Sequence, residues 1–457
     1  WHHRRHRGPA GPLTGSLTTD TVPPSEPSLR GRTVLVVSHD FPPARSPQAI
    51  RAMAFTRRLA AEAAQVVVLT RTRLPGFAEA TVPANVRVLR ASPGWLEERI
   101  DGLVARRRHA EVDDDAQPAA DGKVNASPAA LNWKGRAIAR LRRATDTLCF
   151  PDGRALWVRD AIRQLDALCE SQRPDVALVM HEPAASLLVG RHLGKRGIPW
   201  LADIADPVLA PYTPWHWRGR ATRLEAAALH EAGAASATNP ATVELLAKRH
   251  GPLSKPIVVL PQGFTPMPAV PMPGGDTLRL VYTGRFYPFR DPAPLLAAVA
   301  ATPGVELVIA GPEMPDAVLA AAQRHPDAIR LAGELGHRDA LALQMTADVL
   351  VSVGNAGTAQ APGKVQEYFG AARPLLHVFH DAGDPAPALV RDTGRGLACP
   401  ARADDVAAAL RELLALKRAG GLATRFDLSP DAVQDYRWDA IAGRLAALLA
   451  GLVVDGR

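Results

Sequence analysis

The segment 361–370, APGKVQEYFG, places a lysine and a glutamate three positions apart at the predicted start of a helix. Gly363 would let a ligand approach the backbone, and free N–H groups at a helix start attract phosphate. Lys364 adds a positive charge, and the carboxylate of Glu367 could accept hydrogen bonds from both vicinal hydroxyls of a ribose. The alternative is a surface ion pair between these two side chains, worth about 0.2–0.5 kcal/mol.

Two arginines directly follow a predicted strand in the segment YTGRFYPFRDP (282–292). Gly284 precedes Arg285, and Arg290 comes five residues after Arg285. Because both arginines lie at the carboxyl end of the strand, their guanidinium groups could grip a pyrophosphate by bidentate hydrogen bonds. The simpler interpretation is that both are surface residues, with Arg290 paired with Asp291.

Polar residues also follow predicted strands in the first half of the chain. His181 ends one strand, and the strand and loop at 199–206 carry Asp203 and Asp206. We take His181 and Asp206 as catalytic candidates, and Asp203 and Ser46 as acceptor-side candidates. A strand-end histidine is more often structural, and either aspartate could merely cap the following loop.

The order of elements indicates how these residues are positioned. Strand, loop, helix and strand succeed one another within 33–70, which is a βαβ unit and therefore implies a parallel sheet. The same alternation occupies 175–264 and resumes at 278. Between them, 265–276 holds four prolines and two glycines and is predicted to be a linker. The sequence thus predicts an α/β protein with two Rossmann-like domains and a cleft between them, where ligands meet the carboxyl ends of the strands.

Composition and motifs exclude several classes of protein. The chain has 457 residues and a net charge of +8, which favours anionic partners. Three widely spaced cysteines do not form a disulfide framework or a zinc site. No apolar run is long enough to span a membrane. The first thirty residues lack the apolar centre of a secretory signal. The simplest expectation is a cytoplasmic protein. Dinucleotide-binding and Walker motifs are absent, which disfavours hydride transfer and phosphate hydrolysis.

Together these segments resemble the retaining glycosyltransferases of family 4, which have the GT-B fold, over roughly residues 32–455. TGRFYPFRDP resembles the family's G-R segment, whose basic pair holds the donor diphosphate; here the pair is Arg285 and Arg290. APGKVQEYFGAARPLL resembles its P-S-K-x-x-E-Y-x-A-x-G-x-P segment. That match places Lys364 near the phosphates and Glu367 on the donor ribose. In the first half, VLVVSHDFPPARSPQAIRA resembles the family's opening strand and F-P-P loop. FPDGRALWVRDAI (150–162) and IPWLADIADP (198–207) resemble segments of members that build bacterial surface polysaccharides.

The resemblance implies sugar transfer from a nucleotide-sugar to an acceptor hydroxyl with retention of configuration, in cell-surface polysaccharide or glycolipid synthesis. It implies no metal and no cofactor, and we assign no nucleophile. The chain departs from the family pattern at two positions near the sugar, where Ala359 and Ala205 replace polar residues. These departures keep open the alternative of a non-catalytic nucleotide-sugar-binding partner. A GT-B epimerase is the other alternative, but such an enzyme needs carboxylates and a histidine around the sugar, and the two alanines argue against it. Nucleic-acid binding is disfavoured because the basic residues are scattered and no recognition motif occurs.

With the resemblance, the sequence predicts a disordered basic, proline-rich tail at 1–31 and an acceptor domain at 32–264 that contains a mobile insertion at about 95–130. The linker at 265–276 leads to a nucleotide-sugar-binding domain at 277–437. A C-terminal helix at 438–457 is predicted to return to the acceptor domain.

A basic amphipathic helix is predicted at 131–148. It has five Lys or Arg residues and no acid before Asp146. It predicts peripheral docking on an anionic membrane that carries a lipid-linked acceptor. The alternative is a solvated helix packed on the first domain.

Overall fold

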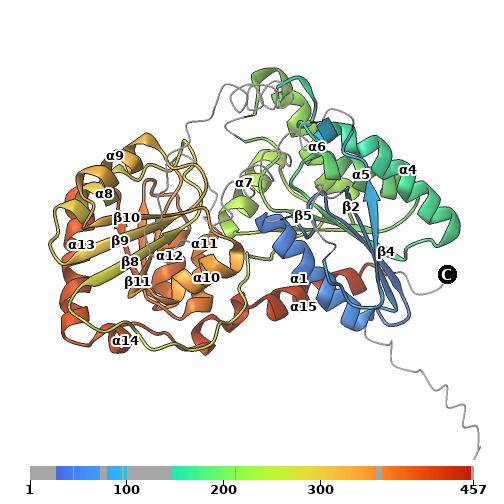
Figure 1. Ribbon diagram of the computed structural model, residues 1–457. Coiled ribbons are helices and arrows are strands. Elements are labelled where there is room, and N and C mark those ends of the chain that lie inside the picture. Colours follow the sequence, from blue (N-terminus) through green and yellow to red (C-terminus); the bar gives the residue numbers. More distant parts are fainter. Residues whose placement is uncertain are drawn as a thin grey trace, which may run out of the picture.

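The structure is a computed structural model that describes residues 27–44, 46–72, 80–94, 97–99, 147–210, 213–356 and 363–453. It consists of two α/β units side by side, each built on one sheet (Figure 1). The predicted tail up to residue 26, most of the predicted insertion and the basic helix up to residue 146 lie outside the described residues.

The first unit has a seven-stranded parallel sheet in the order β3-β2-β1-β4-β5-β6-β7. Its strands are β1 (Thr33–Val37), β2 (Gln65–Arg71), β3 (Val86–Ala91), β4 (Val176–Met180), β5 (Trp200–Ile204), β6 (Ala234–Ala237) and β7 (Ile257–Val259). Its helices are α1 (Pro47–Glu62), α4 (Ala155–Ser171), α5 (Ala185–Lys195), the short η1 (Trp215–Trp217), α6 (Arg218–Glu231) and α7 (Pro240–His250).

The second unit has a six-stranded parallel sheet in the order β10-β9-β8-β11-β12-β13. Its strands are β8 (Leu278–Thr283), β9 (Val305–Ala310), β10 (Ile329–Gly333), β11 (Val349–Val353), β12 (Leu375–Phe379) and β13 (Gly396–Pro400). Its helices are α8 (Ala293–Ala300), α9 (Asp316–Arg324), α10 (His337–Met345), α11 (Lys364–Tyr368), η2 (Phe369–Ala371), α12 (Ala386–Asp392), α13 (Ala403–Arg418), α14 (Leu422–Arg425) and η3 (Asp431–Tyr436).

Both sheets reverse their strand order in the same way. In the first sheet the reversal lies between β1 and β4, and in the second between β8 and β11. This is the order of Rossmann sheets, in which ligands bind outside the carboxyl ends of the strands at the reversal point. The prediction of two Rossmann-like units is confirmed, and each unit has one such point.

Local sequence explains where several helices begin. Ser46 caps α1, because its Oγ accepts a hydrogen bond from the Ala49 N–H at 3.1 Å and Pro47 occupies the first helical position. Asn239 and Pro240 start α7 in the same manner. The helix α4, which the sequence analysis did not predict, buries Trp157, Ala161 and other apolar residues on one face against the first sheet.

The C-terminal helix α15 (Trp438–Ala450) lies against the first unit. Its Ile441, Leu445 and Leu449 are fully buried in a cluster with residues of α1 and of the central strands. The chain therefore crosses between the units twice. The two crossings adjoin, since the Phe264 N–H donates to the Tyr436 carbonyl and the Trp438 N–H donates to the Phe264 carbonyl, both at 3.1 Å.

The segment 265–276, predicted as a linker, is held along the second unit. The Met267 N–H donates to the Gly370 carbonyl at 3.0 Å, and the Arg373 side chain donates to the Pro271 carbonyl at 3.0 Å. Lys417 also donates a hydrogen bond to the Pro273 carbonyl. The passage from one unit to the other thus lies just before this segment, near Phe264.

Candidate functional site

The reversal point of the second sheet brings together the basic residues singled out from the sequence. The end of β8 continues into Gly284 and Arg285, and α11 lies beside it. A side chain added at Gly284 would lie 3.6 Å from the Lys364 Cε, and Arg290 Nη1 donates to the Arg285 carbonyl at 3.1 Å. Gly284 has a φ of +149°, a conformation that favours glycine. Three cationic side chains therefore surround one strand end.

Arg290 is buried without an acidic partner. It is only 7% exposed, and its Nε and Nη2 donate to the Asn355 Oδ1 at 3.0 and 2.8 Å. Its guanidinium carbon lies 5.3 Å from the centre of the Tyr287 ring. No carboxylate of the described residues forms an ion pair with it, and Asp291 instead accepts from the Ala293 N–H. The simpler interpretation, an Arg290–Asp291 pair, is wrong. A buried cation with neutral partners favours an anionic ligand.

Arg285 is exposed and pairs with Glu313, whose carboxylate lies 3.2 Å from its Nη1. An ion pair this accessible to water is worth little, at most about 1 kcal/mol. A diphosphate would therefore compete readily with Glu313 for the guanidinium group.

Lys364 and Glu367 form the ion pair that the sequence left open, with Nζ and Oε1 2.7 Å apart. The pair is half-buried, and Gln344 Nε2 also donates to the same oxygen at 2.9 Å. Desolvation alone would raise the pKa of Glu367, but the charge and hydrogen bond of Lys364, with the Gln344 amide, lower it. Glu367 is thus a carboxylate at neutral pH. Its Oε2 accepts no hydrogen bond from any residue that the structure describes, and remains available to a ligand.

The helix that carries this pair is short. It spans five residues and begins after Gly363, which has helical angles and is exposed. So short a helix has only a small macrodipole, and contact of a phosphate with its N–H groups stays a prediction. The Lys364 charge has to supply the attraction. Ala359 lies outside the described residues.

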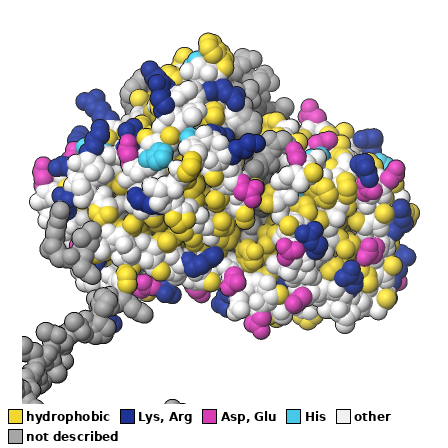
Figure 2. All heavy atoms as spheres, turned by 180° about the vertical axis from the view of Figure 1, so that it is seen from behind, with side chains coloured by type: hydrophobic (Ala, Val, Ile, Leu, Met, Phe, Trp, Pro, Cys, Tyr) yellow, Lys and Arg dark blue, Asp and Glu magenta, His cyan; other side chains and the backbone are white. Residues whose placement is uncertain are grey.

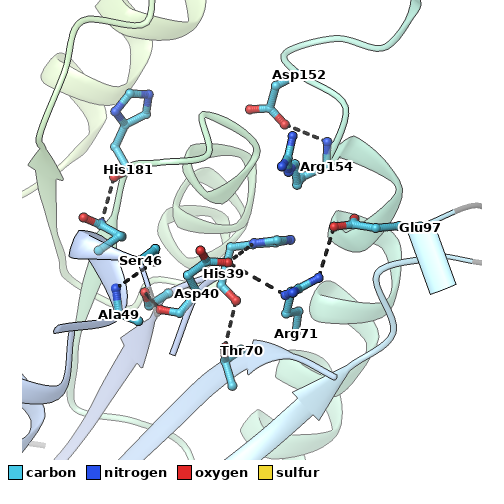
Figure 3. Close-up of polar contacts among 12 residues, drawn as sticks. His39, Asp40, Ser46, Ala49, Thr70, Arg71, Glu97, Asp152, Arg154 and His181 are labelled. Carbon is cyan, nitrogen blue, oxygen red and sulfur yellow. Dashed lines mark hydrogen bonds and ion pairs between the residues drawn. The ribbon is translucent and has the colours of Figure 1, made fainter. Parts of the chain in front are cut away.

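The reversal point of the first sheet collects ionisable side chains, several of which Figure 3 shows. Asp40 follows β1 and accepts from His39 Nδ1 at 3.0 Å, with Arg71 Nε 3.8 Å away. Burial would raise the pKa of Asp40, but the hydrogen bond and charge of His39, together with Arg71, hold it well below its usual range. Ser46, the acceptor-side candidate, lies at this edge as the cap of α1, with its Oγ towards the Ala49 N–H.

His181 directly follows β4 and is almost fully buried. Its backbone carbonyl accepts from Gln48 Nε2 at 2.9 Å, and its Nδ1 has no hydrogen-bond partner among the described residues. Burial lowers the pKa of His181, although the nearby Asp206 carboxylate opposes the shift. The ring is therefore neutral at pH 7. A neutral imidazole can donate or accept one proton, but supplies no charge.

Asp203, expected on the acceptor side, is instead a structural residue. Its carboxylate is fully buried and accepts from Arg51 Nε and Nη2, both at 2.8 Å, and from Ser236 Oγ at 2.8 Å. Arg51 also donates to the carbonyls of Leu260 and Pro261, just before the chain crosses to the second unit. The pair thus fixes the crossing, and its carboxylate is not exposed to an acceptor.

Glu182 is a candidate that sequence reasoning missed. It follows His181 directly, has a positive φ of 88°, and is exposed to solvent. Surrounding protein desolvates its carboxyl, and the charge and hydrogen bond of Asp206 add to this, raising its pKa well above the ordinary value. The sequence signal that could have identified Glu182 was its position directly after a predicted strand. Glu182 and Asp206 thus place two carboxyl groups side by side, and the raised pKa of Glu182 favours its protonated form.

No group of three or more His, Cys, Asp or Glu side chains in the described parts of the chain could hold a metal ion. Nor does any helix there have the length and apolarity needed to cross a bilayer.

Solved structures share this architecture along nearly the whole chain. Sucrose-phosphate synthase from Thermosynechococcus elongatus has a TM-score of 0.65 and 18% identity, covering 92% of this chain and 99% of its own. An E. coli trehalose-6-phosphate protein bound with UDP-2-fluoro glucose has a TM-score of 0.58 and 12% identity, covering 92% and 99%. WaaG, a glycosyltransferase involved in lipopolysaccharide biosynthesis, has a TM-score of 0.55 and 14% identity, covering 92% and 100%.

These neighbours confirm the predicted GT-B fold. At such low identity the likeness concerns the fold alone. No family model matches the sequence, and no curated protein sequence matches it significantly.

Proposed function

We propose that the protein transfers a sugar from a nucleotide-sugar donor to an acceptor hydroxyl. The observation that carries the proposal is Arg290, a buried cation with only neutral partners at the reversal point of the second sheet. Arg285 and Lys364 add exchangeable positive charge beside it. The free Glu367 oxygen lies beside the same cluster, which suits a ribose next to a diphosphate.

This arrangement fits the chemistry of the leaving group. Transfer releases a nucleoside diphosphate, so negative charge grows on the phosphate oxygens as the sugar bond breaks. Preorganised cations stabilise that charge in the transition state. The three basic side chains take this role in the proposal, and no metal or cofactor is needed.

The first unit supplies the acceptor side. His181, neutral and partly unpartnered, and the Glu182–Asp206 pair offer donors and acceptors for sugar hydroxyls. On the strength of the sequence resemblance, we also propose that transfer retains configuration, that the protein belongs to family 4, and that it acts in cell-surface polysaccharide or glycolipid synthesis. A cytoplasmic location is part of the same proposal. Docking through 131–148 stays a prediction.

Two measurements on the full chain test the proposal. Calorimetric titration with UDP, GDP and dTDP should reveal saturable binding of at least one. A panel of nucleotide-sugars with candidate acceptors should then give nucleotide release that depends on the acceptor. Nucleotide binding without sugar transfer would indicate the non-catalytic alternative. Conversion of the donor sugar to its epimer without transfer would indicate the epimerase. Absence of binding by all three nucleotides would rule out the proposed donor site.

A further inference from the structure

An aromatic and basic surface projects from the first unit, at residues that the sequence analysis did not connect. Trp215 is 85% exposed and Leu148 is 75% exposed. They belong to one cluster, because Trp217 Nε1 and His216 Nε2 both contact the Thr147 carbonyl, at 2.8 and 2.9 Å. Exposing this much tryptophan and leucine surface to water is unfavourable in free energy, so the surface is suited to an apolar partner.

Ring contacts join the aromatic residues of this surface. The Phe150 and Trp217 rings lie 5.4 Å apart, and the Trp215 and His216 rings lie 5.6 Å apart. The Arg220 guanidinium lies 5.1 Å from the Trp217 ring. The aromatic side chains of this surface thus pack against one another and against Arg220.

Positive charge surrounds the aromatic residues. Arg218, Arg220 and Arg223 are exposed in the first turns of α6, and none forms an ion pair with a residue that the structure describes. The first turn of that helix has no acidic residue. Cations at a helix N-terminus oppose its dipole, so they do not stabilise the helix there. An external anionic partner would offset this repulsion.

The position of the surface is equally specific. Because η1 and the start of α6 follow β5, they lie at the carboxyl edge of the first sheet, the edge that carries His181 and Asp206. Asp152, beside Phe150, accepts from the Ala185 N–H at the start of α5 and fixes the cluster to that edge. Figure 1 places α6 at the top of the first unit, and Figure 2 shows hydrophobic side chains at that apex with basic side chains on its flanks.

We propose that this surface, formed by Leu148, Trp215, Trp217 and the arginines 218, 220 and 223, docks on an anionic phospholipid bilayer. Tryptophan and leucine enter the headgroup region, and arginines contact lipid phosphates. Exposed apolar groups beside cations without ion-pair partners among the described residues favour a lipid surface as the partner. A second copy of this chain is disfavoured, because it would bring a patch of like charge. The inference is independent of the proposed sugar transfer, and of the predicted basic helix.

Sedimentation of the full chain with vesicles tests it. Binding should be measured on phosphatidylcholine alone and on phosphatidylcholine with 30% phosphatidylglycerol. The protein should sediment with the anionic vesicles and much less with the neutral ones. Trp215→Ala combined with Leu148→Ala should lower the partition coefficient at least tenfold. Arg218→Gln combined with Arg223→Gln should lower the partition coefficient roughly 25-fold, because each arginine near an anionic surface contributes about fivefold.

Matched controls lie on the second unit. Val270→Ala removes an exposed apolar side chain there, and Arg330→Gln with Arg411→Gln removes two exposed arginines. These variants should bind vesicles within twofold of the unaltered protein. All substituted residues are exposed, and thermal unfolding should verify that the variants stay folded. Equal binding to neutral and anionic vesicles, or binding unchanged in both patch variants, would overturn the proposal. So would failure of the unaltered protein to sediment.

Discussion

Arg290 is held by Asn355: two guanidinium nitrogens, Nε and Nη2, donate to a single amide oxygen at 3.0 and 2.8 Å. The amide fixes the orientation of the side chain without neutralising it. A carboxylate in the same place would orient Arg290 equally well but would cancel its charge. An amide in place of an acid therefore preserves the positive charge of Arg290, which the proposed donor site needs to attract a diphosphate.

Asn355→Asp should accordingly weaken binding of the preferred nucleoside diphosphate about tenfold or more, the equivalent of ~1.4 kcal/mol. The new carboxylate would pair with Arg290 and repel the ligand. Calorimetry gives the dissociation constant directly. Glu412→Ala, which removes an exposed acid on α13, serves as the control and should leave the constant unchanged. Undiminished affinity in the Asp variant would mean that Arg290 does not contact the diphosphate.

Glu367→Ala should reduce both nucleotide affinity and transfer, because the ribose hydroxyls lose their acceptor. The expected loss of affinity is about tenfold to a hundredfold, the range of a hydrogen bond to a charged group. Comparison of a nucleoside diphosphate with inorganic pyrophosphate isolates the ribose contribution. The variant should lose affinity for the nucleotide and largely retain it for pyrophosphate. Equal losses for both would indicate that Glu367 acts only by orienting Lys364.

The grouping of the basic residues at the second reversal point could be predicted from the sequence because they lie in two short segments after strands. Lys364 and Glu367 are three positions apart, and Arg285 and Arg290 are five apart, so local spacing was sufficient to group them. Local spacing could not show that Arg290 is partnered by a residue 65 positions away. It therefore left open whether that arginine was free for a ligand.

The first unit was harder to predict because its polar contacts join neighbouring strands. Asp203 and Asp206 look alike in the sequence, yet one points into the core towards Arg51 and the other lies near Glu182. The partner of Asp203 is 152 positions away on α1. The small strand β6, AASA, was missed because alanine and serine give no strand signal.

The role of Asp203 can be tested through stability. Asp203→Ala would leave Arg51 buried without its counter-charge, so the free energy of unfolding should fall by about 3–5 kcal/mol. Urea or guanidinium titration followed by circular dichroism measures the loss. Asp206→Asn, at a half-buried strand end, should change stability far less and serves as the control. A stable Asp203→Ala variant with impaired transfer would restore Asp203 to the acceptor side.

The last prediction concerns pH and Glu182. Its pKa is raised in the folded protein above the ordinary value of 4.5, so the native state binds a proton that the unfolded chain releases. Stability is therefore lost as the pH rises above about 4.5, through the window up to the raised folded pKa.

Glu182→Gln keeps a hydrogen-bond donor towards Asp206 but cannot ionise, so it should remove this loss. Relative to the unaltered protein, the variant should gain stability as the pH rises above 4.5 and show little difference at or below pH 4.5. Denaturant unfolding at several pH values gives the difference curve. Glu412→Gln, on an exposed helix face, should give a flat curve. A flat curve for Glu182→Gln as well would mean that Glu182 is ionised in the folded protein, and that the pair with Asp206 does not share a proton.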